Sequence, residues 1–416
     1  MVEDVHWFVG IDWATQSHRA VLLDAEARQV GEREFSHGGA GLTELRDWLL
    51  QKTAAAPGQI AVAIEMPHGP VVEMLLEHGF AVFAINPKQL DRFRDRFTVA
   101  GAKDDSRDAH VLGDSLRTDR KAFRKLATDN PAVIELREWS RIADELQQER
   151  TRLANRLRQQ LWRYYPQMAE LTDDVGDAWF LALWHKVPTP AAAKVTEKAV
   201  ARILKDHRIR RLDAATVLLT LRKTALFVAP GTTEAACVHI RSLAARMHLV
   251  NQQIKEACNA LDSLCAKLGA PDEESPSGQS HEQCDVAILR SWPGIGRIVL
   301  ATLLTEAAQP LQARDYHALR ALAGVAPVTR QSGRQRFVIR RLACNRRLQT
   351  AVHHWSRVAI QHDAAARRCY DALRQRHGHA RALRSVGDRL LSALCATLKR
   401  QVLYDANLRS PQPATP

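Results

Sequence analysis

Four acidic side chains have the types and spacing needed for phosphate chemistry. Asp12 and Glu65 each end a short apolar run, and a strand gains nothing from ending in a carboxylate. Asp105 and Asp108 are three residues apart in a helical segment, so they share one face. Carboxylates from two strands and a helix are suitable ligands for a pair of Mg²⁺ or Mn²⁺ ions. Two such ions, about 3.5–4 Å apart, stabilise the attacking and leaving oxygens of a phosphoryl displacement. The plain alternative is four scattered surface acids.

A serine in an arginine-rich stretch offers a nucleophile for the same chemistry. Ser332 precedes Gly333, where little side-chain bulk hinders a close backbone approach. Guanidinium groups stabilise the charge of a pentacovalent phosphate formed by a serine hydroxyl. The residues alone leave a second interpretation open, in which the hydroxyl only hydrogen-bonds the backbone of a Ser-Gly turn. Tyr316 is the competing nucleophile, although helix packing explains its position.

Glycines at the start of a helix provide a further phosphate-binding element. The sequence Pro293-Gly294-Ile295-Gly296 opens a predicted helix that runs to Glu306, and free backbone N–H groups at such a start can bind a phosphate. A plain turn explains the same glycines equally well. The residues expected to contact nucleic acid are Lys103, Gly294, Gly296, Arg330, Arg334, Arg336, Arg340, Arg341, Arg346 and Arg347.

Charge is placed unevenly along the 416 residues. The chain carries a net charge of +13, whereas residues 313–400 alone hold 19 Lys and Arg against 4 acids, which is +15. A long basic block predicts a polyanionic partner, most simply nucleic acid, although a merely soluble basic face is the alternative.

Other features of the composition predict a cytoplasmic protein. The chain has no apolar run of about 18 residues and no signal-peptide pattern at its N-terminus, so we expect a bacterial cytoplasmic protein with no membrane partner. The seven cysteines form no CxxC pair, which favours core thiols over disulfides or zinc.

Hydrophobic periodicity predicts an α/β domain at the N-terminus. The expected order is three antiparallel strands followed by helix–strand crossovers. The expected strands are 7–13, 18–24, 29–35, 60–65 and 80–85, and the expected helices are 41–51 and 71–78. This order predicts a ribonuclease H-like mixed sheet in which the first strand lies centrally beside the fourth. Asp12 and Glu65 would then lie together.

The rest of the chain is predicted to be mainly helical. Apolar residues at three-four spacing predict two long helices, one from Pro131 and one over 235–268, that form a coiled-coil or helical-hairpin arm. The two helices could pair within one chain or between chains. The expected divisions are a catalytic domain at 1–130, the arm at 131–269, a linker at 270–284, a C-terminal domain with Ser332 at 285–405 and a disordered tail at 406–416.

Three motifs resemble those of a known family over nearly the whole chain. Residues 103–109, Lys-Asp-Asp-Ser-Arg-Asp-Ala, match a signature close to Lys-Thr-Asp-Arg-Leu-Asp-Ala. Residues 293–296 match Pro-Gly-Ile-Gly, and Gly324, Pro327 and the triplet 331–333 match Gly-x-x-Pro followed by Gln-Ser-Gly. The chain is similar in these motifs to the DEDD transposases (recombinases) of the bacterial insertion-sequence-110 family. One departure is Cys344, where the family often has glycine.

The resemblance implies a fold, an activity and a set of partners. It implies a resolvase-like, ribonuclease H-type N-terminal domain whose Asp12, Glu65, Asp105 and Asp108 bind two Mg²⁺ or Mn²⁺ ions, a coiled-coil arm and a C-terminal domain in which Ser332 is the nucleophile. It also implies DNA recombination guided by a bridging non-coding RNA. The expected assembly is a homo-oligomer, dimers forming a tetramer, in which the metal-binding half of one subunit completes the serine half of another.

Two other functions agree with parts of the sequence. A Holliday-junction-resolvase-like endonuclease would use the four acids and water, with no covalent intermediate, but would leave the basic C-terminal block unused. A non-enzymatic nucleic-acid-binding scaffold with a decayed metal site would use only the basic block.

Overall fold

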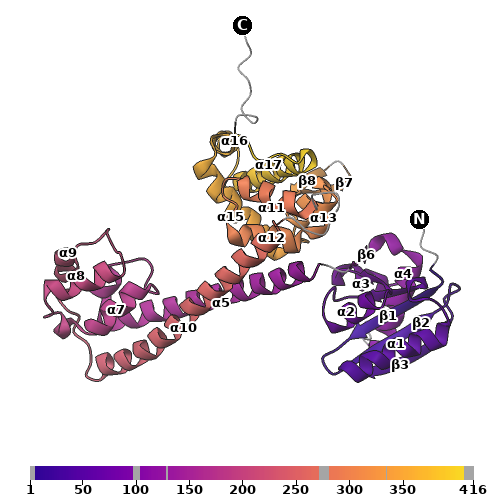
Figure 1. The fold of residues 1–416 in the computed structure, drawn as a ribbon, viewed down its shortest axis with the longest axis horizontal. Coiled ribbons are helices and arrows are strands. Elements are labelled where there is room, and N and C mark those ends of the chain that lie inside the picture. The colour runs from indigo at the N-terminus through magenta and orange to yellow at the C-terminus, as the bar shows by residue number, and fades with distance from the viewer. Residues whose placement is uncertain (1–4, 97–103, 128–129, 271–280, 334, 407–416) are drawn as a thin grey trace, which may run out of the picture. The chain divides into compact units, whose positions relative to one another are not determined.

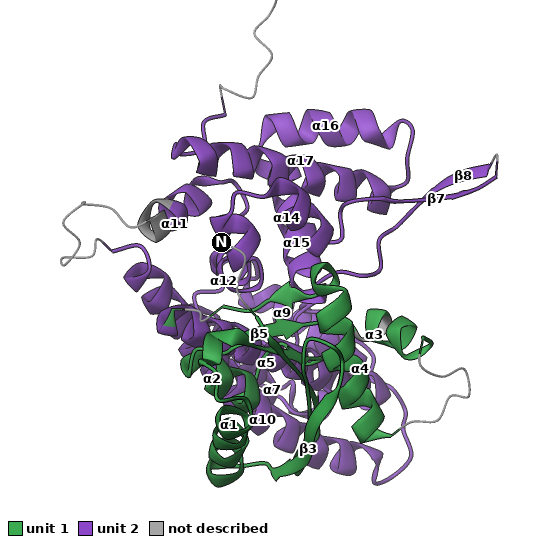
Figure 2. Ribbon diagram, turned by 90° about the vertical axis from the view of Figure 1, so that its right-hand side faces the viewer, with its two compact units in different colours: residues 1–130 green, residues 131–416 purple. Residues whose placement is uncertain are grey.

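The computed structural model describes residues 5–96, 104–127, 130–270, 281–333 and 335–406, with the backbone alone at 87–88 and 281–284. The chain divides into two compact units, residues 1–130 and 131–416, coloured separately in Figure 2. Each unit is described by itself below.

The first unit contains a six-stranded mixed sheet in the order β3-β2-β1-β4-β5-β6. Its strands are β1 (Trp7–Trp13), β2 (Ser17–Leu23), β3 (Gln29–Ser36), β4 (Ile60–Ile64), β5 (Ala81–Ala84) and β6 (Arg124–Lys125). Strand β1 pairs antiparallel with β2 and parallel with β4. The predicted mixed sheet, with the first strand central and beside the fourth, is therefore confirmed.

Helices cover both faces of this sheet. They are α1 (Gly39–Thr53), η1 (Pro57–Gln59), α2 (Pro70–Glu77), α3 (Pro87–Arg94), α4 (Asp105–Thr118) and η2 (Arg120–Ala122). Alternate strand residues point to opposite faces, so Val9 and Ile11 join the cluster under α1 and α2, whereas Phe8 joins the cluster under α3 and α4. The result is an α/β domain with a buried central strand.

Two elements of the first unit were not predicted. The expected helices include none directly after the strand 80–85, yet α3 begins at Pro87. Proline is well tolerated at the first position of a helix because its missing N–H needs no partner there. The short edge strand β6 pairs with β5 through Phe83 and Lys125.

The second unit begins with the long helix α5 (Pro131–Tyr164). A second long helix, α10 (Thr232–Lys267), runs antiparallel to it, and the two lie side by side in Figure 1. Arg150 donates to Asn251 at 2.8 Å across this pair. Between them the chain forms α6 (Pro166–Ala169), α7 (Ala178–Lys186), η3 (Pro190–Ala192), α8 (Glu197–Asp206) and α9 (Ala214–Leu221). These short helices and the adjoining ends of α5 and α10 share one hydrophobic core, which the sequence analysis did not predict.

The remaining residues form a helical bundle on the other ends of α5 and α10. Its helices are α11 (His281–Ser291), α12 (Arg297–Glu306), α13 (Ala308–Gln312), α14 (Tyr316–Leu322), α15 (Arg346–His362), α16 (Ala364–Arg374) and α17 (His379–Arg400). A single hydrophobic cluster joins these helices to α5 and α10. The predicted mainly helical character is confirmed, and α11 begins inside the segment interpreted as a linker.

A single hairpin interrupts the helices of this bundle. Strands β7 (Val328–Ser332) and β8 (Gln335–Ile339) pair antiparallel, with Arg330 opposite Phe337 and Ser332 opposite Gln335.

In the described part of the chain, no helix is both long and apolar enough to cross a bilayer.

Candidate active site

The four predicted acids, Asp12, Glu65, Asp105 and Asp108, line one pocket of about 210 Å³, which Glu34 also lines. Strands β1 and β4 run parallel with Ile11 beside Ile64, so the next residues, Asp12 near the end of β1 and Glu65 just after β4, lie at the same end of the two strands. The first turn of α4 supplies the remaining two carboxylates, Asp105 and Asp108. Sheet register and helix docking thus bring together residues as far apart in the sequence as Asp12 and Asp108.

Close backbone contact between β1 and α4 fixes this arrangement. A Cβ atom added to Gly10 would lie 1.8 Å from the carbonyl oxygen of Ala109 and 2.6 Å from the backbone nitrogen of Gly113. Only glycine at position 10 lets the helix lie directly on the strand. Because Asp12 is two residues beyond Gly10 on the same strand, this contact also sets the position of α4 relative to Asp12.

The carboxylates repel one another. Burial and the negative charges of Asp108, Asp105 and Glu65 raise the pKa of Asp12 to about 6, while Arg94 acts in the opposite direction. A group whose charged form is disfavoured by neighbouring charges of the same sign is stabilised by a cation in its pocket. The electrostatics of the pocket therefore favour a positively charged ligand.

Arg94 already supplies one positive charge. It donates from Nε and Nη2 to the two carboxylate oxygens of Asp108, at 2.8 and 2.9 Å, and from Nη1 to Asp91 at 2.7 Å. Asp108 is only 3% exposed, so its carboxylate would be costly to bury without such a partner. Arg94 was not among the predicted site residues, because α3 itself was not predicted from the sequence.

The donor chemistry of the pocket fits a hard divalent cation, since all four acids offer carboxylate oxygens. In the described residues, however, no group of three or more His, Cys, Asp or Glu side chains has the mutual arrangement that holds a metal ion. The bidentate pair with Arg94 occupies both oxygens of Asp108. Coordination by all four acids would require Asp108 to exchange Arg94 for the cation.

The neighbouring acid Asp104 has a different role. Its side chain accepts a hydrogen bond from the backbone N–H of Ser106 at 3.3 Å and caps the N-terminus of α4. It does not line the pocket, whereas Asp105 and Asp108 do. Asp104 therefore caps the helix, whereas Asp105 and Asp108, three residues apart on one face of α4, are the two carboxylates in the pocket.

Ser332 lies at the end of β7, on an exposed hairpin of the second unit. Gly333 follows it with φ +56°, a left-handed conformation that favours glycine. Residues 316–362 contain nine arginines and no acid (Arg320, Arg330, Arg334, Arg336, Arg340, Arg341, Arg346, Arg347 and Arg357). The serine therefore lies in a strongly positive part of the sequence. Arg334 and Lys103 fall outside the described residues.

The described arginines differ in their partners. Arg330 and Arg336 are exposed on the hairpin. Arg340 donates to Gln349 at 2.9 Å, a neutral acceptor that leaves its charge uncompensated. Arg347 instead contacts Asp144 at 3.1 Å and Glu306 at 3.4 Å. Its charge is already balanced within the protein, so Arg347 serves to join α15 to α5 and α12.

Gly294 and Gly296 precede α12 in different environments. Gly294 has φ +87°, and a Cβ atom there would lie 3.1 Å from the backbone nitrogen of Ala359. The adjacent Pro293 carbonyl accepts a hydrogen bond from Trp355 at 2.9 Å. Packing against α15 therefore explains Gly294. Gly296 caps α12, and a Cβ atom there would meet nothing within 4 Å, so this helix start has room for a ligand.

Tyr316, the competing nucleophile, is held by a hydrogen bond. Its hydroxyl donates to Asp388 at 2.9 Å, and Arg320 binds the same carboxylate. Burial and the Asp388 carboxylate raise the pKa of Tyr316 to about 12. A phenol that is already engaged and harder to deprotonate is a weaker nucleophile than a free one.

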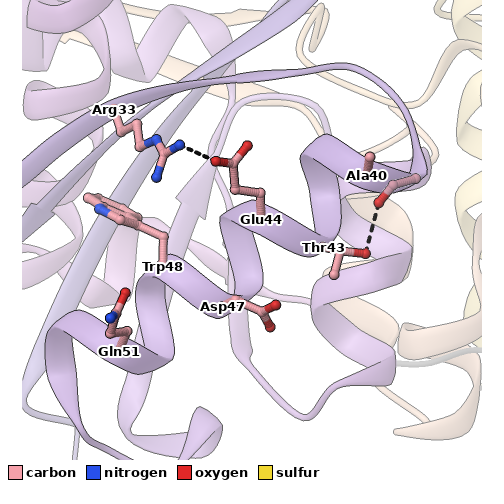
Figure 3. Close-up of a pocket in the computed structure, with 8 residues that line it drawn as sticks. Arg33, Ala40, Thr43, Glu44, Asp47, Trp48 and Gln51 are labelled. Carbon is pink, nitrogen blue, oxygen red and sulfur yellow. Dashed lines mark hydrogen bonds and ion pairs between the residues drawn. The ribbon is translucent and has the colours of Figure 1, made fainter.

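A larger hollow in the first unit lacks comparable chemistry. About 490 Å³ lies over α1 and β3, beside the side chains drawn in Figure 3. There Arg33 pairs with Glu44, and the Thr43 hydroxyl donates to the carbonyl of Gly39 at 2.8 Å (Figure 3). Trp48 is buried against Phe35, with ring centroids 5.4 Å apart. These polar groups satisfy one another, so we assign no ligand to this hollow.

Comparison with known proteins identifies the same two regions. A family described as "Transposase", of the DEDD type of IS110, matches residues 9–166, which include all four pocket acids. A second, "Transposase IS116/IS110/IS902 family", matches residues 286–371, which include the serine hairpin.

Curated relatives extend the match to the whole chain. The chain is 32% identical over 408 residues to the "Mini-circle putative transposase for IS117" of Streptomyces coelicolor, covering 96% of this chain and 95% of that protein. It is 58% identical over 216 residues to "Putative transposase y4uE" of Sinorhizobium fredii, covering 51% of this chain and 60% of that protein. A 43.6 kDa protein of insertion element IS110 from Streptomyces coelicolor is 26% identical over 430 residues.

Both matched regions and the nearly full-length similarity lead to one conclusion. The first matched region covers the mixed α/β unit from Val9 and continues into α5, and the second matched region lies in the helical unit. The family suggests the use of a divalent metal, and transposases act on DNA. The chain belongs to the IS110 family of insertion-sequence transposases and is a DNA-recombining enzyme.

Proposed function

We propose that this transposase cuts and rejoins DNA with two chemical groups, a carboxylate pocket that holds divalent cations and the hydroxyl of Ser332. The observation that carries the proposal is the convergence of Asp12, Glu65, Asp105 and Asp108 on one pocket. The strand order of the sheet, three antiparallel strands followed by parallel crossovers, supports a ribonuclease H-like, resolvase-type domain.

Mg²⁺ or Mn²⁺, two ions per site, would polarise the scissile phosphate when bound. The residues that would hold them are the four pocket acids, with Asp108 released from Arg94. The Ser332 hydroxyl then forms a new P–O bond, the P–O bond to a deoxyribose oxygen breaks, and that oxygen leaves as a hydroxyl. A deoxyribose hydroxyl of another strand attacks the phosphoserine, restores the serine and completes the joined strand.

The arginines around the hairpin support the serine in this reaction. Arg330 lies two residues before Ser332 on β7 and shares its face, and guanidinium groups stabilise the extra negative charge of a pentacovalent phosphate. Arg336 pairs with Gln331 on the opposite face and adds positive charge to the hairpin. Residues 321–350 contain neither His nor Lys, so no such side chain close to Ser332 in the sequence can act as its general base. The serine proton therefore passes to a group that another part of the protein or the DNA supplies.

Partners follow from the family and the charge. The +15 of residues 313–400 supports binding of DNA element ends and target. We further propose that a bridging non-coding RNA selects the sequences by base pairing. The paired helices α5 and α10 are proposed as a coiled-coil arm that assembles copies of the chain into a homo-oligomer, dimers forming a tetramer.

One observation favours a second function. The four acids all belong to the first unit, so a resolvase-like endonuclease could work without the serine. It would use water as the nucleophile and form no bond between protein and DNA.

A suicide DNA substrate distinguishes the two functions. The substrate is a duplex of the element's junction, nicked so that the cleaved strand diffuses away. We expect a protein–DNA band on denaturing gels that requires Mg²⁺ and is absent from Ser332→Ala. Thr329→Ala, on the opposite face of the same strand, is the matched control and retains the band. Cleavage without any covalent band would support the endonuclease, and a band that persists in Ser332→Ala would exclude this serine.

A further inference from the structure

The hairpin that carries Ser332 has no covered face. Every described residue of β8, and every residue of β7 except Val328, is exposed. Figure 2 shows the two strands projecting from the helices of the second unit. An isolated two-stranded hairpin is only marginally stable in water. Apolar side chains on such a hairpin therefore indicate a surface that contacts another molecule.

Strand register places one aromatic ring on the serine's face. Ser332 pairs with Gln335 and Arg330 pairs with Phe337. Directly opposed residues share a face, and positions two apart on a strand share it too, so Ser332, Arg330 and Phe337 lie on the same side of the hairpin. Diagonal neighbours such as Ser332 and Phe337 are about 7–8 Å apart at their Cα atoms, within reach of an aromatic side chain.

Phe337 does not contribute to the core of the protein. Its side chain is 57% exposed, and it belongs to none of the hydrophobic clusters formed by the described residues. An exposed phenylalanine gains nothing from water, and its ring has a flat apolar face on which a nucleobase can stack. Its cross-strand neighbour is the exposed Arg330, which suits a phosphate.

Charge decides which partner fits this surface. Residues 316–362 contain nine arginines and no acid, so the neighbourhood of the ring is complementary to a polyanion. Proteins that bind single strands combine such a positive surface with aromatic rings that stack on successive bases. Apolar side chains inserted between base steps also unstack duplex DNA. A nucleic-acid strand therefore matches both the charge and the ring.

We propose that Phe337 stacks on an unpaired DNA base beside the phosphate that Ser332 attacks, and thereby positions that phosphate. The link to the attacked phosphate rests on the proposed role of Ser332. The stacking itself rests only on the hairpin geometry, the exposure of the ring and the surrounding charge.

Photocrosslinking tests the stacking directly. The probe is a single-stranded DNA in which thymidine is replaced by 5-iododeoxyuridine, bound to the full-length Ser332→Ala protein so that no strand is cut. Ultraviolet light joins this base to an aromatic ring stacked on it, and mass spectrometry locates the joined residue. We expect the crosslink at Phe337, and in Phe337→Leu we expect its loss together with an about tenfold lower affinity. Phe337→Trp should retain the affinity.

Val338 provides the matched control. It is 54% exposed on the same strand but points to the opposite face, so Val338→Ala should leave the crosslink and the affinity unchanged. A crosslink that avoids Phe337, or equal affinities of Phe337→Leu and the parent, would overturn the proposal. So would a Phe337→Leu protein that loses its oligomeric state in size-exclusion chromatography but binds the probe normally, because the ring would then contact a second copy.

The outcome is separable from that of the nucleophile. If the suicide substrate forms its adduct through Ser332 but no crosslink reaches Phe337, the stacking proposal fails alone. If the crosslink reaches Phe337 but the adduct persists in Ser332→Ala, the stacking stands and its link to the attacked phosphate fails.

Discussion

The carboxylate pocket and the serine hairpin belong to one enzyme but are built in opposite ways. The pocket lies at the end of a buried central strand, and the contact between Gly10 and α4 leaves its backbone no freedom to shift. Every described residue of the hairpin except the half-buried Val328 is exposed, Ser332 included. The proposed cation site needs a fixed spacing of its carboxylates, whereas the proposed nucleophile, which would form and release a bond to DNA, benefits from access.

The largest effect is expected at the pocket. Asp105→Asn removes one carboxylate from the proposed cation site, and because Asp105 is exposed the change should leave folding intact. We expect no detectable recombination in Mg²⁺ and unchanged DNA binding, measured by product formation and by a mobility shift.

Asp104→Asn is the control, because asparagine caps a helix about as well as aspartate. It removes the same charge one residue away, outside the pocket. Near-normal recombination by Asp105→Asn, or equal losses in both variants, would mean that the pocket is not the cation site.

The next largest difference is expected in stability, when a glycine in each of the two regions is replaced by alanine. Gly10→Ala would force α4 away from β1, and overpacking of this kind costs about 3 kcal/mol. Gly333→Ala, at φ +56° with open space around it, should cost only about 1 kcal/mol, since an L-residue there is strained but not obstructed.

Chemical denaturation followed by circular dichroism measures the free energy of unfolding of both variants. A recombination assay should also show lower activity for Gly10→Ala. Equal unfolding free energies for the two variants would show that the contact between β1 and α4 does not position the pocket.

The same contrast explains what the sequence could predict. Short apolar runs ending in Asp12 and Glu65 predicted two adjacent strands, because the hydrophobic pattern specifies which strands are buried. The helix α3 and its Arg94 were missed, since Pro87 signals a helix start as well as a break. Contact between Gly10 and Gly113 depends on tertiary docking, which local pattern does not encode. The motif around Ser332 pointed to chemistry but not to strands, because no buried face imposes alternation there.

Two arginines of the basic block should have separable roles. Arg336→Gln removes an exposed charge from the hairpin, so the slope of log affinity against log salt should fall by about 1 for DNA, with no change in stability. Arg347→Gln removes the ion pairs to Asp144 and Glu306 and should cost about 2 kcal/mol of stability. Salt titrations and thermal unfolding test the pair. A steeper loss of DNA affinity in Arg347→Gln than in Arg336→Gln would contradict these assignments.

The smallest effect concerns Arg94. Its guanidinium occupies both oxygens of Asp108, so a cation that needs this carboxylate must compete with it. Arg94→Gln should tighten Mn²⁺ binding about fivefold, which is about 1 kcal/mol. Isothermal titration of the DNA-free protein measures this affinity.

Arg19→Gln separates competition from a general change in charge. Arg19 lines the same pocket but pairs with Glu32 and Glu34, so this variant removes an equal charge and leaves Asp108 engaged. A smaller gain in Mn²⁺ affinity is therefore expected for Arg19→Gln. Equal gains in Mn²⁺ affinity in the two variants would mean that Arg94 affects cation binding only through its charge. A weaker affinity in Arg94→Gln would mean that Arg94 orients Asp108 for the cation, and the rigid pocket would then depend on a side chain that the sequence pattern did not reveal.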